Sequence, residues 1–182
     1  MKKLFKLLIG IIACSILFLY LVLPLVKIEG ENYHLVEYLK YIFDNISATF
    51  KNLDFTQVDM LWNVVVWLLM LVIITSPIGC LVVVALKGIT SGLLTKRNLT
   101  VISLELLSFA FSAFLIGICY YLLNKYSLSS DANQLQIAMV KIACTHIWEP
   151  TLYISAFGSL LLSGLTIYTN SIKKKMPKEE AE

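Results

Sequence analysis

The chain has 182 residues, of which 58% are hydrophobic and only 15% are charged, and its formal net charge is +3. A soluble domain has roughly 45–50% apolar and about 25% charged residues, so this composition excludes an ordinary soluble enzyme and a disordered polypeptide. The four cysteines include no Cys-x-x-Cys pair, which excludes a disulfide scaffold and a zinc finger. We therefore expect an integral membrane protein.

Four apolar stretches are long enough to cross a bilayer core, which needs roughly 20 helical residues. They cover residues 4–26, 61–86, 99–123 and 151–172. The first continues twelve residues beyond Cys14, which predicts an uncleaved membrane helix rather than a signal peptide. The predicted fold class is an all-α bundle of four transmembrane helices in one domain, residues 1–182.

The segment between the first two spans, residues 27–60, is predicted to contain an amphipathic helix. Apolar residues recur in it at helical spacing, with charged residues between them. They are Leu35, Leu39, Ile42, Ile46 and Phe50. This face either covers the bundle, or enters the headgroup layer, or docks a partner, and the docking hypothesis assigns these five residues to a partner-binding surface.

The second span contains the sequence Ser-Pro-Ile-Gly, with Pro77 and Gly79 in the middle of an apolar helix. Pro77 has no N–H to donate to the carbonyl of Ile73. A helix kink is therefore predicted at these two residues.

The third span carries one charge, Glu105, about six residues from its cytoplasmic end. A carboxylate at that depth costs a few kcal/mol unless it is paired, hydrated or protonated. Lys6 lies at a similar depth in the first span. We predict an intramembrane Lys6–Glu105 pair that fixes helix order, with a proton-handling role of Glu105 as the alternative.

The second outer segment, residues 124–150, is predicted to hold a short helix that is capped by a residue among 129–131 and runs into the fourth span. Cys144, His146 and Glu149 cluster after it, but Cys144 and His146 cannot share a helical face, so no metal site is expected. A disulfide between Cys119 and Cys144 is left open.

Small residues recur every few positions in the last two spans. They are Ser108, Ser112 and Gly117 in the third, and Ser155, Gly158, Ser159 and Ser163 in the fourth. Such residues let helix backbones approach closely, and hydroxyl groups form hydrogen bonds across helices. We predict helix packing within the chain, with a seam for a neighbouring subunit as the alternative.

The basic residues predict the orientation. Ten lie in the two termini and the segment between the second and third spans, whereas residues 27–60 and 124–150 hold five basic residues and eight acids. By the positive-inside rule both termini are cytoplasmic, including the tail 173–182, and the basic rim attracts anionic membrane lipids. The short lysine-rich termini and compact loops favour a bacterial cell membrane.

The topology resembles that of claudins and tetraspanins, with four spans and two outer loops. Residues 27–60 contain neither Trp nor Cys, and the chain has no Cys-Cys-Gly, so no family is assigned. No hydrolase or nucleotide-binding motif is present, and no cofactor is expected.

These features predict a non-enzymatic accessory or partner-binding subunit of a larger membrane complex. The expected partner is another membrane or extracellular protein. A homo-oligomer is an alternative, and no nucleic acid is expected. Two further hypotheses are an immunity protein that binds a toxin at the outer face and a small proton or ion transporter that uses Glu105.

Overall fold

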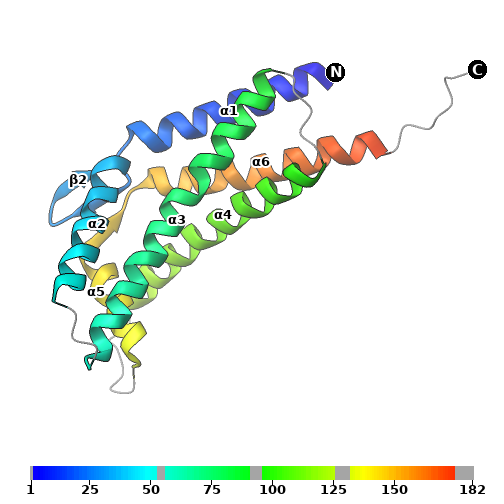
Figure 1. Cartoon of the computed structure of the whole chain (residues 1–182). Coiled ribbons are helices and arrows are strands. Elements are labelled where there is room, and N and C mark those ends of the chain that lie inside the picture. The colour runs from blue at the N-terminus through cyan, green and yellow to red at the C-terminus, as the bar shows by residue number, and fades with distance from the viewer. Residues whose placement is uncertain (1, 53–55, 91–95, 126–131, 175–182) are drawn as a thin grey trace, which may run out of the picture.

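The computed structural model describes residues 2–52, 56–90, 96–125 and 132–174. Four long helices in it are apolar enough to cross a membrane: α1 (Lys2–Val22), α3 (Val58–Ile89), α4 (Lys96–Lys125) and α6 (Pro150–Lys174). The start of α1 and the end of α6 lie at the same end of the bundle (Figure 1). The predicted all-α class is confirmed, and the chain is a multi-pass membrane protein.

Both α1 and α4 pack along α3 and α6. α1 and α4 also meet each other where the rings of Tyr20 and Phe109 lie with their centroids 5.7 Å apart. In the half nearer the termini, Ala13, Leu81, Leu106 and Leu162 bring one buried side chain from each helix into a common core. Close packing of this kind holds membrane helices together, because lipid tails are as apolar as the helix surfaces.

The helix ends differ from the predicted spans by a few residues. α3 has 32 residues, about 48 Å at 1.5 Å per residue, so it exceeds the roughly 30 Å bilayer core and extends beyond it or tilts. α1 ends at Val22 instead of residue 26. Pro24 lies two residues further along, and its missing N–H cannot continue the helix.

Both predicted amphipathic helices are present at the other end of the bundle. α2 (Leu35–Lys51) follows His34, whose backbone N–H donates to Glu37 Oε2 at 3.0 Å. α5 (Gln134–Thr145) begins after Asn133, whose side chain accepts from the Gln136 N–H at 2.9 Å. The cap is thus Asn133, and the predicted candidates 129–131 lie outside the described residues.

A three-stranded antiparallel sheet, which the sequence analysis did not predict, joins the two loops. β1 (Val26–Ile28) lies between β2 (Glu31–Tyr33) and β3 (His146–Trp148). Glu29 and Gly30 connect β1 to β2 with positive φ angles of 53° and 95°, as a tight two-residue hairpin turn requires. β1 pairs with β3 from Val26 opposite Trp148 to Ile28 opposite His146. We call the unit formed by β1, β2, α2, α5 and β3 the cap.

Candidate functional site

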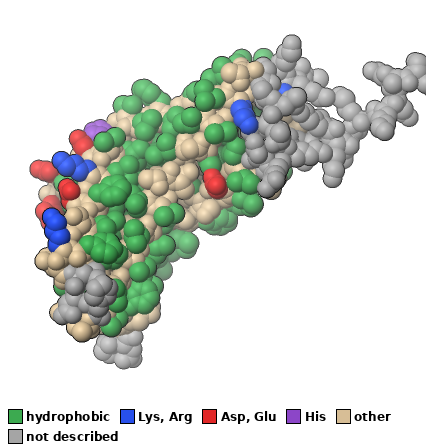
Figure 2. All heavy atoms as spheres, in the orientation of Figure 1, with side chains coloured by type: hydrophobic (Ala, Val, Ile, Leu, Met, Phe, Trp, Pro, Cys, Tyr) green, Lys and Arg blue, Asp and Glu red, His purple; other side chains and the backbone are tan. Residues whose placement is uncertain are grey.

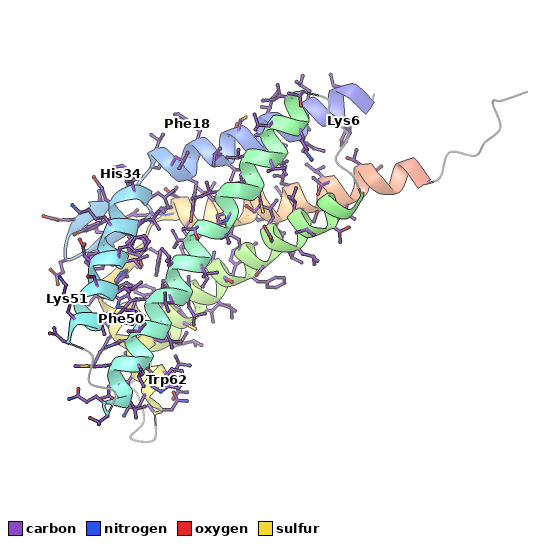
Figure 3. All side chains as sticks on the ribbon, in the orientation of Figure 1. Lys6, Phe18, His34, Phe50, Lys51 and Trp62 are labelled. Atoms are coloured by element: carbon purple, nitrogen blue, oxygen red, sulfur yellow. The ribbon has the colours of Figure 1, made fainter. Side chains whose placement is uncertain are left out.

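The cap carries the charged end of the molecule. Figure 2 shows acidic, basic and histidine side chains gathered over β2 and α2, while hydrophobic side chains cover the length of the bundle. His34 and Lys51 mark the two ends of α2, and Lys6 lies at the opposite end of the molecule (Figure 3). The cap is therefore the part of the described chain where charged and histidine side chains gather on a folded surface.

A buried aromatic cluster holds the cap on the bundle. Its centre is His146, which is 0% exposed and has four aromatic rings around it at centroid distances of 5.6–6.0 Å. These are Tyr38 and Tyr41 of α2, Trp67 of α3 and Trp148 of β3. Edge-to-face and tilted ring pairs of this kind each contribute about 0.5–1.5 kcal/mol beyond area burial.

Thr145 is the hydrogen-bond partner of the His146 ring. Its Oγ1 lies 2.9 Å from His146 Nδ1, and 3.0 Å and 3.1 Å from the carbonyls of Ile142 and Lys141. When the hydroxyl donates to one of these carbonyls, Nδ1–H is the donor in the contact with Thr145. Nε2 then carries the lone pair, and it has no partner among the described residues.

Burial sets the acid–base properties of this cluster. Desolvation lowers the pKa of His146 to about 4, with a smaller opposing contribution from the backbone of Ile142. Desolvation likewise raises the pKa of Tyr38, whose hydroxyl also lacks a partner in the described part of the chain. The imidazole is thus neutral at pH 7.

The structure corrects the predicted docking surface on α2. Leu35 and Ile42 are fully buried, and Leu39 and Ile46 are half-buried against the same core, so this side of α2 covers the bundle. Of the five predicted residues only Phe50 is exposed. The helical spacing shows that these residues share a side of the helix, but it does not show what that side contacts.

A different apolar set is exposed on α2. Val36, Phe43 and Phe50 are 73%, 56% and 56% exposed. They are seven residues apart, so they project from nearly the same side, with an offset of only about 20° per step. We call these three residues the α2 stripe.

Glu105 is placed against Cys80 and not against Lys6. Cys80 of α3 donates its thiol hydrogen to Glu105 Oε2 across the α3–α4 contact. Among the described residues no ion pair joins Glu105 to Lys6, and the carboxylate contacts Cys80 instead. Glu105 is exposed on the bundle surface, where a thiol, a weak donor, compensates only part of the cost of a carboxylate in lipid.

α3 runs through Pro77 as one helix, and hydroxyl groups bond to the carbonyls beside it. Ser76 Oγ donates to the Ile73 carbonyl at 3.1 Å, which replaces the bond that Pro77 cannot make. Tyr20 of α1 donates to the next carbonyl, that of Ile74, at 2.9 Å. Gly79 is exposed, with nothing within 4 Å of where a Cβ would stand.

The small residues of α4 and α6 fall into two groups. Ser163 donates to the Ser103 carbonyl at 3.2 Å, and Ser103 bonds Thr166 at 3.0 Å, so hydroxyl groups link the two helices. Ser155 and Ser159 are buried without a hydrogen-bond partner among the described residues.

The remaining predicted packing residues do not all lie in contacts between helices. Gly117 lies against the ring of Tyr153, and Gly158 lies against Ile16 of α1. Ser112 is half-buried, and Ser108 is exposed, so Ser108 faces away from the helix seam.

A close backbone contact between α1 and α3 involves a pair of glycines that the sequence analysis missed. A Cβ on Gly88 of α3 would lie 2.6 Å from Gly10 Cα and 3.0 Å from the Lys6 carbonyl oxygen of α1. A single glycine in a helix does not predict a helix–helix contact, because no repeated spacing of small residues accompanies it. The contact between Gly10 and Gly88 is seen only when the positions of α1 and α3 are known.

The four cysteines are all free. The Cys119–Cys144 disulfide left open above is therefore not formed, with Cys119 half-buried and Cys144 exposed. Within the described residues no group of three His, Cys, Asp or Glu side chains is placed to hold a metal ion.

A scan against protein-family models, a search of curated proteins and a search of solved structures each found no match for the chain.

Proposed function

We propose that this chain is a non-enzymatic subunit of a larger membrane complex, and that it binds a second membrane protein through the α2 stripe. The observation that carries the proposal is the exposure of Val36, Phe43 and Phe50 on a helix that is held in place by its buried residues Leu35, Tyr38 and Ile42. Exposed apolar side chains on a rigid element typically mark a contact surface.

The surroundings of the stripe favour a protein as the partner. Lys40, Asp44 and Lys51 are exposed on the same helix beside the stripe. An apolar centre bordered by charges of both signs is the usual anatomy of a protein interface. The partner would present an apolar surface at the level of the cap and charges that complement this mixed border.

The size of the complex in mild detergent tests the proposal. We expect the double change Phe43→Ser and Phe50→Ser to release the chain from its complex, because two aromatic anchors are lost. A matched control, Asp44→Ser with Ala48→Ser, places two serines on the polar side of the same helix and should leave the complex intact. The opposite pattern, or equal effects of both pairs, argues against docking at the stripe.

The proposed orientation places the cap outside the cell and both termini in the cytoplasm, as the positive-inside rule predicts. Cys144 is exposed in the cap, whereas Cys14, Cys80 and Cys119 lie within membrane helices. A membrane-impermeant maleimide should therefore label intact cells at Cys144, and a Cys144→Ser variant should lose the label. Labelling that appears only after the membrane is permeabilised means that the orientation is reversed.

A further inference from the structure

One fully buried histidine connects α2 and the sheet of the cap to the membrane helix α3. The His146 ring contacts Tyr38 and Tyr41 of α2 and Trp67 of α3, and its backbone pairs with Ile28 of β1. Any change in the charge of this ring therefore acts on α2, α3 and the sheet together.

The surroundings of His146 favour the neutral imidazole. Nδ1 lies 2.9 Å from Thr145 Oγ1, and Nε2 is buried without a partner among the described residues. A proton added at Nε2 would create a charged donor with no acceptor in an aromatic enclosure, which is costly in a low-dielectric interior.

No neighbouring carboxylate compensates such a charge. The groups that face the ring are the Tyr38 and Tyr41 phenols from α2, Trp67 from α3, Trp148 from its own strand and Thr145 from α5. Charged residues also occur along the packed elements, and none of them forms an ion pair with His146 in the described part of the chain. They are Lys27, Glu37, Lys40, Asp44, Lys51, Asp59, Lys87, Lys141 and Glu149.

We infer that acid opens the cap: proton uptake by His146 separates β3 from β1 and α2, while the four membrane helices stay packed. This response to pH is separate from the proposed partner binding and does not depend on it.

The direction of the pH effect follows from the difference in the pKa of His146 between the closed and the open cap. Burial lowers the pKa of His146 to about 4 in the closed cap, and an open cap returns it toward the ordinary value near 6.5. The open form then binds protons more tightly, so closure is fully stabilised above pH 6.5 and is progressively lost as the pH falls toward 4. With these two values, the opening equilibrium rises about 60-fold between pH 7 and pH 4.5.

Hydrogen exchange on the full chain in lipid nanodiscs measures this opening. After correction for the intrinsic pH dependence of exchange, protection of residues 25–33 and 146–149 should fall about 60-fold from pH 7 to pH 4.5. The amides around Ser103 and Thr166, in the α4–α6 seam, should keep their protection. Equal protection of the cap at both pH values would overturn the inference. An equal loss of protection in the α4–α6 seam would also overturn it, because the membrane helices would then open together with the cap.

The two histidines of the chain provide matched variants. His146→Asn keeps a donor for Thr145 but cannot titrate, so the pH dependence should disappear. His34→Asn removes the exposed histidine and keeps a good N-cap residue for α2, so the wild-type pH dependence should remain. Full pH dependence in His146→Asn contradicts the inference.

A measurement on the wild-type chain keeps the inference testable if His146→Asn does not fold. NMR titration of the imidazole Cε1–H gives the pKa of each histidine directly. We expect a pKa near 4 for His146. An ordinary value near 6.5 for this ring would overturn the inference.

Discussion

Gly88→Ala should destabilise the bundle more than any other methyl addition to its glycines. The new Cβ would meet the Gly10 backbone at 2.6 Å, and a backbone cannot move aside as a flexible side chain can. Overpacking of this kind costs about 1–3 kcal/mol, and at a helix crossing it forces α1 and α3 apart. The free energy of unfolding, measured by titration with SDS in mixed micelles, gives the size of the loss.

Two other glycines serve as controls for that loss. Gly79 and Gly164 have nothing within 4 Å of where a Cβ would stand. Alanine at these positions should be neutral, or should stabilise the helix by up to about 1 kcal/mol, because glycine has excess entropy in the unfolded chain. If Gly88→Ala behaves like the Gly79→Ala and Gly164→Ala variants, α1 and α3 do not cross at this glycine pair.

Ile42→Ala should weaken the cap by about 2–5 kcal/mol, because a fully buried branched side chain leaves a cavity. Its neighbour Phe43 is 56% exposed, so Phe43→Ala should change folding stability by less than about 0.5 kcal/mol. Thermal unfolding followed by tryptophan fluorescence suits this pair, since Trp67 and Trp148 lie in the cluster under α2. Similar losses for both variants would mean that the side of α2 facing the bundle is assigned incorrectly.

The sequence was sufficient to predict what depends on local composition. Four apolar stretches predicted the four spans, and helical spacing between residues 35 and 50 predicted α2, which the structure places at Leu35–Lys51. Helix ends were less predictable, because Pro24 ends α1 before the apolar run itself ends.

Features that depend on distant pairing were not predictable from the sequence. β1 and β3 have three residues each and lie more than a hundred positions apart, so neither shows a strand periodicity of its own. The partner of Glu105 depended on helix order in the bundle, and hydropathy does not encode that order. The same holds for His146, which the sequence analysis grouped with Cys144 and Glu149 but which lies at the centre of the aromatic cluster.

The most direct test of partner binding at the α2 stripe is photo-cross-linking in living cells, with p-benzoylphenylalanine at position 43 or at position 44. Position 43 lies in the stripe, and position 44 lies beside it on the polar side of the same helix. We expect a single cross-linked product at position 43, identified by mass spectrometry as one membrane protein, and none at position 44. Products at 43 that contain only lipid or a second copy of this chain, or equal products at both positions, would contradict the proposed subunit role.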